Sequence, residues 1–251
     1  MTLLAGCGTG PAPAPPDAGG TPLDHPLPAS IETLPLVDSA GHPTDLAAYR
    51  GKVVVLSDMM TLCQESCPLD TANIVATARQ VQRAGLGDQV EFLSVTIDPV
   101  RDSTSRLAAY RALFAPAPAD WAVLGGTRAD LARLWKYLGL YYQRAPEVSP
   151  PARDWLTGKP LTYDISHADM VFFFGTGGDE RYTMDGTAHV AAADQMPGTL
   201  RRFLSATGRQ NLAHPGFGSW TVDQALQAIG WLAGRRIGTA PPPGGESRTA
   251  G

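Results

Sequence analysis

Two uninterrupted apolar runs predict the centre of the fold. Residues 52–57 read KVVVLS and residues 90–97 read VEFLSVTI, and neither shows the alternation of a half-exposed strand. Such runs are typical of strands that are buried on both faces of a sheet. Between them, residues 69–84 carry apolar side chains at helical spacing and stop at Gly85, a residue type that commonly ends helices. The pattern therefore predicts a strand–helix–strand unit.

The rest of the chain continues this alternation. We predict an edge strand over 31–38 interrupted by Pro35, helices over 103–114 and from Thr127 or Arg128 to Leu138, a strand over 121–125, a hairpin of 170–174 and 181–184, a helix over 194–206 stopped by Gly208, and a last helix over 222–232. Alternating strands and helices followed by a hairpin and a helix predict an α/β protein. We expect a central mixed β-sheet flanked by helices, in the order of a thioredoxin-like fold.

Composition divides the chain into one ordered domain and two tails. The 251 residues are 43% hydrophobic and 18% charged, with a formal net charge of −4. No basic block is visible, so nucleic acid is not an expected partner. Many of the glycines and prolines lie in the two ends of the chain, which predicts disorder there. We predict a leader and tether over 1–28, a domain over 29–208, and a C-terminal extension over 209–251 with one helix and a disordered tail.

Cys7 has an explanation separate from the rest of the chain. It ends the run Leu4-Ala5-Gly6-Cys7, which resembles a bacterial lipobox, and a Pro/Ala/Gly stretch over 8–28 follows. The resemblance implies lipidation of Cys7 and an extracytoplasmic protein anchored to the outer face of the bacterial cell membrane. Only six residues precede Cys7, so we expect the true start to lie upstream or the leader to have been trimmed. The alternative is a chance cysteine in a disordered tail.

Cys63 and Cys67 are the most informative pair in the sequence. They stand four residues apart in CQESCP, directly after the first apolar run, and Pro68 suits the first turn of the following helix. A helix N-terminus favours a thiolate, which both a redox thiol and a metal ligand require. The pair alone therefore predicts either disulfide exchange or two ligands of a soft metal.

His167 favours the metal interpretation. It lies in DISHADMVFFF, just before the predicted hairpin. In a thioredoxin-like fold this loop faces the cysteine loop, and ordinary thioredoxins place a cis-proline there. Two sulfurs and one imidazole suit Cu(I), whereas structural zinc normally takes four protein ligands. A histidine that is only hydrogen-bonded at a strand end is the structural alternative.

Three motifs together resemble the Sco/SenC proteins over roughly residues 30–205. They are the run from Lys52, the Cys63-x-x-x-Cys67-Pro68 loop, and Asp98-Pro99-Val100-Arg101-Asp102, with His167 following late in the chain. The resemblance implies a thioredoxin-like fold and copper bound by Cys63, Cys67 and His167. It also implies a role in assembling the copper A centre of cytochrome c oxidase, whose copper-binding subunit would be a partner. Asp98 matches an acidic residue near the family's metal site, so it is a possible auxiliary ligand.

Several of these residues have structural alternatives. Asp98 with Arg101 is also a turn and helix-start signal, with Asp102 or Ser103 as N-cap. Met59 and Met60 could be thioether ligands, but strand-end packing is the more ordinary role. The chain departs from the family at Met60-Thr61-Leu62-Cys63-Gln64, where the family usually has a Tyr-Thr-x-Cys-Pro start. The proline-rich segment 143–164 leads into His167 and could act as a lid. The remaining histidines are expected at the surface: His25, His42, His189 and His214.

Three functions are compatible with this sequence. The first is an extracytoplasmic copper metallochaperone rather than an enzyme. The second is a thiol–disulfide oxidoreductase that cycles Cys63 and Cys67. The third and weakest is a peroxidase, because a peroxidatic cysteine usually stands alone beside an arginine, and the nearby charges here are Glu65 and Asp70.

Overall fold

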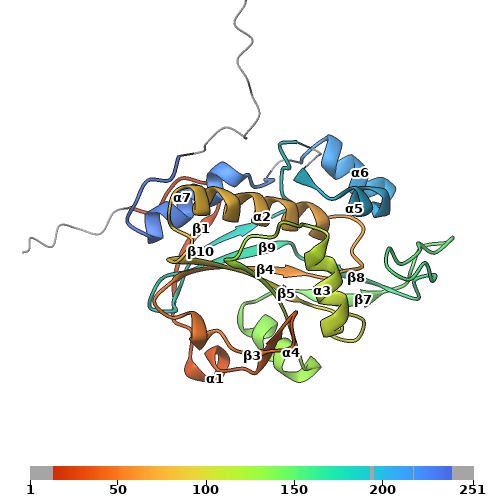
Figure 1. The fold of residues 1–251 in the computed structure, drawn as a ribbon, viewed down its shortest axis with the longest axis horizontal. Helices are drawn as coiled ribbons and strands as arrows, with labels where there is room; N and C mark the ends of the chain where they lie inside the picture. The colour runs from red at the N-terminus through yellow and green to blue at the C-terminus, as the bar shows by residue number, and fades with distance from the viewer. Residues whose placement is uncertain (1–13, 193–194, 217, 239–251) are drawn as a thin grey trace, which may run out of the picture.

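A mixed β-sheet forms the centre of the molecule. The computed structural model describes residues 14–192, 195–216 and 218–238. Within them, eight strands form one sheet in the order β1-β10-β9-β4-β5-β6-β2-β3 (Figure 1). The central strand β4 is parallel to β5 and antiparallel to β9. The strands are β1 Thr21–His25, β2 Leu36–Asp38, β3 Pro43–Thr44, β4 Val53–Met59, β5 Val90–Thr96, β6 Trp121–Gly126, β9 Met170–Phe174 and β10 Glu180–Asp185.

The two apolar runs form the central strands, as predicted. Every residue of β4 and β5 is buried. Their polar side chains satisfy one another, since the Ser57 and Ser94 hydroxyls lie 3.2 Å apart and Trp121 Nε1 donates to Ser94 Oγ at 3.1 Å. A buried polar group costs free energy unless it is hydrogen-bonded. The serines in these strands therefore do not disturb the core.

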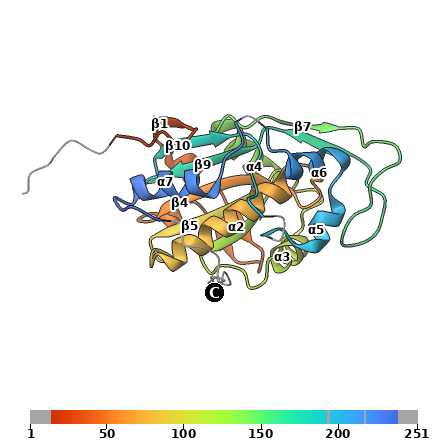
Figure 2. The same ribbon diagram turned by 90° about the horizontal axis from the view of Figure 1, so that it is seen from above.

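Helices cover both faces of the sheet. α2 and α7 lie on one face and α1 and α4 on the other (Figure 1), and Figure 2 looks down on the α2–α7 face. Tyr110 of α3 donates a hydrogen bond to Thr71 of α2, which places these two helices together. The expected central mixed sheet flanked by helices is confirmed. The helices are α1 Ala29–Glu32, the 3-10 turn η1 Ala47–Tyr49, α2 Cys67–Arg83, α3 Thr104–Ala112, α4 Arg128–Tyr137, α5 Gly198–Phe203, α6 Ala206–Ala213 and α7 Val222–Leu232.

Side-chain caps fix the helix starts. Ser103, Thr127 and Thr221 accept hydrogen bonds from backbone N–H groups three residues later, at the starts of α3, α4 and α7. Such caps satisfy N–H groups that have no partner inside the helix. The predicted helices 103–114, 127–138 and 222–232 are thereby confirmed to within two residues at each end.

Two elements differ from the sequence prediction. Residues 31–38 are not one interrupted strand, because the short helix α1 comes first and only β2 pairs in the sheet. The helix predicted over 194–206 is instead two helices, α5 and α6. Gly208 does not end a helix: it lies inside α6, where a β-carbon would come within 2.1 Å of the Gln64 carbonyl oxygen. That glycine is needed for close approach to the cysteine loop rather than for a turn.

The predicted tether over 8–28 is wrong for residues 21–25. These residues form β1, which pairs antiparallel with β10 at the edge of the sheet. The approach to this strand is also fixed, because the Gly20 N–H donates to the Tyr182 hydroxyl at 2.9 Å. Composition predicted disorder here, but an exposed sheet edge offers backbone partners to any extended segment. Cys7 lies outside the described residues. No helix of the described residues combines the length and apolarity needed to cross a membrane.

The proline-rich segment 143–164 is part of a long arm. Its ends pair as a second, two-stranded sheet of β7 Tyr142–Ala145 and β8 Asp164–His167. The middle of the arm folds back onto the domain, where Asp154 forms a two-pronged ion pair with Arg106 and the Trp155 indole donates to the Thr61 carbonyl at 2.7 Å. The arm therefore packs beside the cysteine loop, as a lid would require.

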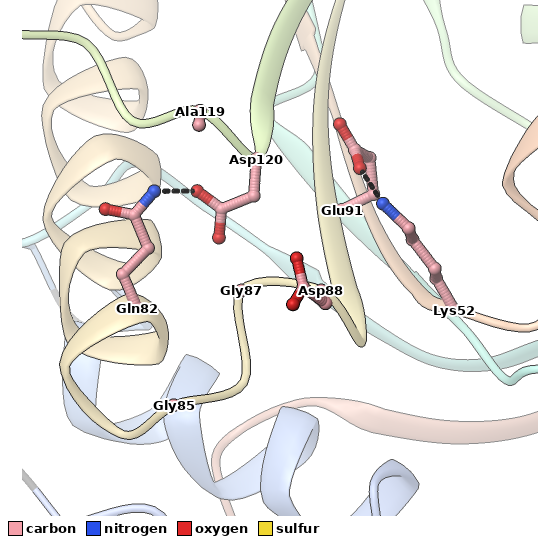
Figure 3. Close-up of a pocket in the computed structure, with 8 residues that line it drawn as sticks. All are labelled: Lys52, Gln82, Gly85, Gly87, Asp88, Glu91, Ala119 and Asp120. Carbon is pink, nitrogen blue, oxygen red and sulfur yellow. Dashed lines mark hydrogen bonds and ion pairs between the residues drawn. The ribbon is translucent and has the colours of Figure 1, made fainter.

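The end of the sheet away from the cysteines carries an acidic hollow. Gln82 and Gly85, at the C-terminal end of α2, line it together with Asp88, Glu91 and Asp120 (Figure 3). Gln82 Nε2 donates to Asp120 Oδ1 at 2.7 Å, and Lys52 pairs with Glu91 at 2.7 Å. Burial raises the pKa of Asp120 to about 6. Because Cys67 is the first residue of α2, the whole helix, about 25 Å, separates this hollow from the cysteines.

Candidate metal centre

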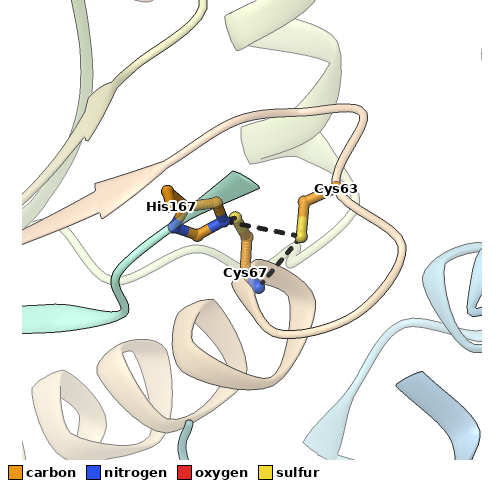
Figure 4. Close-up of side chains that lie close together, drawn as sticks. All are labelled: Cys63, Cys67 and His167. Atoms are coloured by element: carbon orange, nitrogen blue, oxygen red, sulfur yellow. Dashed lines mark hydrogen bonds between the residues drawn. The ribbon is translucent and has the colours of Figure 1, made fainter. Parts of the chain in front are cut away.

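Cys63, Cys67 and His167 converge at one end of the sheet. One possible ligand atom from each lies within 4.8 Å of the others. His167 Nε2 is 3.4 Å from Cys67 Sγ and 4.0 Å from Cys63 Sγ, so the ring presents one nitrogen to both sulfurs (Figure 4). Both cysteines are buried and unbridged. This is the group of three donors that the sequence predicted.

Separate elements carry the three side chains. Cys63 lies in the loop after β4, Cys67 begins α2, and His167 ends β8. The loop curls around the first sulfur, since the backbone N–H groups of Glu65 and Cys67 point to Cys63 Sγ at 3.5 and 3.4 Å. Backbone donors of this kind stabilise a thiolate. Local folding therefore prepares Cys63 as an anionic donor.

The two thiols have opposite pKa shifts. The hydrogen bond with Cys67, opposed in part by burial and aided by His167, holds the pKa of Cys63 well below its usual value. Burial, and then the neighbouring Cys63, raises the pKa of Cys67 well above its usual value. Two buried sulfurs this close cannot both be anionic without a nearby cation. Cys63 is therefore the more readily ionised of the two thiols in the metal-free site.

Asp102 fixes the cysteine loop. Its carboxylate accepts hydrogen bonds from the Thr61 N–H and hydroxyl, at 3.2 and 2.5 Å, and from the Thr96 hydroxyl at 2.6 Å. Burial raises the pKa of Asp102 to about 6. Ser103, not Asp102, caps α3. Asp102 therefore has a structural role other than the cap, joining the strand β5 to the loop that precedes Cys63.

Polar groups that were not predicted from the sequence contact Nδ1 of His167, the ring nitrogen that faces away from the sulfurs. Its Nδ1 lies 3.0 Å from the Ala168 carbonyl oxygen, 2.9 Å from Asp58 Oδ2 and 3.5 Å from Asp169 Oδ1. The Asp58 contact is close but not aligned as a hydrogen bond, so its effect is mainly electrostatic. A partner on one ring nitrogen sets the orientation of the other. These contacts direct Nε2 towards the sulfurs.

The charges around His167 are buried together. Burial opposes a charged ring, but the Asp58 carboxylate and Cys63 outweigh it and raise the pKa of His167 to about 12. Burial also raises the pKa of Asp58 and Asp169. A buried carboxylate is costly unless a cation accompanies it. The site is therefore built to hold positive charge at the position of His167 and the two sulfurs.

Comparison with known proteins identifies the family. The sequence profile described as SCO1/SenC matches residues 28–205. The chain belongs to the SCO1/SenC family. It is 24% identical over 171 residues to the mitochondrial protein SCO2 homolog of Bos taurus, and 26% identical over 172 residues to a putative copper-binding protein of Stutzerimonas stutzeri. These matches cover 68% of this chain in each case, and 58% and 74% of the relatives. The chain thus spans less than two thirds of the bovine protein's length.

A solved structure supports the same fold. The SCO1/SenC family lipoprotein of Bacillus anthracis str. Ames superimposes with a TM-score of 0.54 at 22% identity, covering 72% of this chain and 95% of that one. At this identity the likeness shows the fold alone. The expected thioredoxin-like fold of the SCO1/SenC domain is confirmed.

Asp98 lies outside the three-donor group of this SCO1/SenC chain. Its carboxylate is paired with the Arg101 guanidinium on one oxygen and accepts from the Tyr163 hydroxyl at 3.0 Å on the other. Both oxygens are thus engaged in closing the turn after β5. The turn interpretation accounts for these contacts, and the closest acidic neighbour of His167 is Asp58 instead.

The other soft or basic donors do not join the group. Met59 and Met60 are 1% exposed and belong to the main core cluster, as strand-end packing predicts. His25 pairs with Glu180 and His42 with Asp38, while His189 and His214 are exposed. Among the described residues, the metal-ligating group therefore has three donors, one fewer than structural zinc normally takes.

Proposed function

We propose that this chain is a copper-binding metallochaperone of the cell envelope. In this proposal it delivers copper to the copper A centre of cytochrome c oxidase, or assists the assembly of that centre. One observation carries the proposal: Cys63, Cys67 and His167, which are distant in sequence, present two sulfurs and one nitrogen within 4.8 Å of one another. Membership of the SCO1/SenC family and likeness to a relative named as copper-binding support the choice of metal.

The donor set fits Cu(I). Thiolates are soft ligands that favour Cu(I), and imidazole also suits copper. Bound copper would supply the positive charge that two adjacent thiolates need, so Cys67 could give up its proton despite its burial. His167 contributes Nε2 while Ala168 and Asp58 hold the opposite side of the ring. Copper is cargo here, so the chain's own task is to bind it in reduced form and release it to a partner.

Copper content tests this function directly. We expect one copper per chain in the reduced protein, with sulfur and nitrogen neighbours in X-ray absorption, because the group offers those donors. Oxidation should join Cys63 and Cys67 as a disulfide and release the copper, since a disulfide offers no thiolate. A Cys63→Ser, Cys67→Ser variant provides the copper-free control. Only oxygen and nitrogen neighbours, or stoichiometric Cu(I) in the disulfide form, would contradict the proposed ligands.

Thiol–disulfide exchange is the second candidate function. The specific observation in its favour is the asymmetry of the pair, with the pKa of Cys63 lowered and that of Cys67 raised. A low-pKa thiolate beside a second thiol is the arrangement of a disulfide oxidoreductase. The same asymmetry is compatible with a metal site that awaits its cation. His167 distinguishes the two, because exchange needs only the sulfurs.

We further propose that Cys7 is lipidated and anchors the protein to the outer face of the bacterial cell membrane. The Leu4-Ala5-Gly6-Cys7 run and the Pro/Ala/Gly-rich stretch that follows it in the sequence support this. Stable anchoring needs more than one acyl chain. We expect a Cys7→Ser variant of the full-length gene product to leave the membrane fraction while keeping its copper. A variant that stays as firmly bound as wild type would refute lipid anchoring.

A further inference from the structure

The exposed large apolar side chains of the described residues lie near the arm. They are Val100, Tyr141, Val148 and Leu156, with 61, 57, 71 and 48% of their surface accessible. Val100 follows β5, and the other three belong to the segment that carries β7 and the arm. Single exposed apolar residues are ordinary, but Val100 also lines a groove, where an exposed apolar side chain is suited to protein contact.

A groove of about 410 Å³ lies in this region, on the side of β7 that faces the turn after β5. Its apolar surface comes from Ile97, Val100 and Tyr142. Ile165 of β8 and Tyr163, the residue before β8, complete it. Arg128 and Arg144 are exposed at the same groove. The groove therefore combines apolar walls with two available guanidinium groups.

Of the two exposed arginines that line the groove, Arg144 is held in place. The Arg101 and Arg144 guanidinium carbons lie 3.7 and 3.8 Å from the centre of the Tyr163 ring. Two guanidinium groups at that distance cannot share one face, so the ring is sandwiched between them. Arg101 is neutralised by Asp98, which leaves Arg144 and Arg128 as the accessible charges. Prepositioned charges bind an anionic group with less loss of side-chain entropy.

The groove adjoins the metal centre. Ile165 lines the groove and also lines the hollow of about 290 Å³ that contains Cys63 and His167. It precedes His167 by two residues in β8, so the same short strand borders both. Anything seated in the groove therefore lies beside the hollow that contains two of the proposed copper ligands.

The charge of the groove contrasts with that of its surroundings. The chain has a net charge of −4, and the neighbouring metal hollow is lined by Glu65, Asp164 and Asp169. The hollow at the far end of α2 is also acidic. The basic groove therefore lies beside an acidic hollow, so neighbouring parts of the surface carry opposite charges. Such a pattern steers and orients a partner of complementary charge.

We propose that this groove docks an acidic segment with apolar side chains, belonging to the protein that exchanges copper with this chain. The inference rests on the proposed copper function and adds the surface and the partner's chemistry to it. Carboxylates of the partner would meet Arg128 and Arg144, and its apolar side chains would cover Val100 and Tyr142. The acidic surround of the metal hollow would repel the same carboxylates and so fix the direction of docking.

The test measures copper transfer after copper binding has been checked separately. The Cu(I)-loaded full chain is mixed with the purified, metal-free soluble copper A domain of the oxidase subunit from the same organism. We expect Arg128→Glu, Arg144→Glu to reduce the second-order transfer rate by at least about tenfold at low salt, with the difference shrinking near 0.5 M salt as the charges are screened. Ala132→Trp, which fills the groove from the exposed face of α4, should slow transfer without this salt dependence.

Matched variants separate docking from folding and from copper binding. Arg235 and Arg236 are exposed and follow α7 directly in the chain. α7 lies at the opposite end of the molecule from β7 in both ribbon views (Figures 1 and 2), so their double reversal should leave the rate within about twofold. Arg128→Glu is also measured alone, because the Tyr163 ring is stacked by Arg101 and Arg144 and not by Arg128. An acidic residue is favourable at the start of α4, so slower transfer by this single variant would not reflect damage to the stack or to the helix. Unchanged transfer by the groove variants, or no association of the loaded wild type with the domain, would overturn the docking site. A wild type that binds no copper would instead overturn the proposed function.

Discussion

Replacing His167 by alanine is expected to weaken Cu(I) binding by a factor on the order of a hundred or more. Loss of an outer-shell partner of a metal ligand commonly costs 10–100-fold in affinity, and loss of the ligand itself should cost at least as much. The buried imidazole is 5% exposed in its side chain, so solvent cannot easily supply a substitute donor. Competition with a chelator of known Cu(I) affinity measures the change. His189→Ala is the matched control, because that ring is exposed and outside the three-donor group.

The same variant separates the two candidate functions. Disulfide exchange uses only Cys63 and Cys67, so His167→Ala should still form its disulfide and reduce a model disulfide within a few-fold of the wild-type rate. A metallochaperone should fail to restore cytochrome oxidase activity to a deletion strain. Full restoration by a variant that has lost copper would show that thiol chemistry is the function. Normal copper binding with failed restoration would show that the proposed ligand set is wrong.

The central fold could be predicted because its signals are local. The strands β4 and β5 are long apolar runs, and Thr127 begins α4 with a cap that is visible in the sequence. The errors arose where tertiary contact decides the structure. β1 lies in a segment of tether-like composition and is ordered by pairing with β10. Gly208 has the sequence signature of a helix stop, yet it is present because α6 touches the carbonyl of Gln64.

The donor group could be predicted because its residue types are rare and chemically specific. Two cysteines and a histidine at the ends of predicted strands leave few alternatives, and the structure brings them together. The polar contacts on Nδ1 of His167 could not be predicted. Asp58 lies in the apolar strand β4, 109 positions before His167. It touches His167 only because β9, which begins three residues after His167, pairs with β4. An aspartate within a buried run was nevertheless a usable signal, since a lone buried charge requires a partner.

Asp58 offers a second variant of large expected effect. As a carboxylate it only accepts hydrogen bonds, so beside Nδ1 it favours keeping the proton on that nitrogen when the ring gives up its Nε2 proton to bind copper. Asparagine would keep an oxygen for the Met170 N–H, which Asp58 Oδ1 accepts at 2.9 Å. Its amide N–H groups would then lie near Nδ1 and favour the opposite ring form, with Nε2 protonated. Asp58→Asn therefore changes the charge and the proton position with little change in shape.

We expect Asp58→Asn to lower Cu(I) affinity by about 10–100-fold, in the range for outer-shell partners of metal-bound histidine. Nitrogen chemical shifts of the His167 ring in the metal-free protein, followed against pH, should show the ring losing its second proton at lower pH than in the wild type, because Asp58 is one of the groups that raise its pKa to about 12. A merely structural role would not produce this change. Asp169→Asn is the matched control, because Asp169 lies farther from Nδ1, at 3.5 Å, and also accepts from the Thr187 hydroxyl at 2.8 Å. Its effect on affinity should be clearly smaller. Equal losses from both substitutions would mean that Asp58 contributes only general negative charge. An unchanged ring titration in Asp58→Asn would mean that the Ala168 carbonyl alone orients His167.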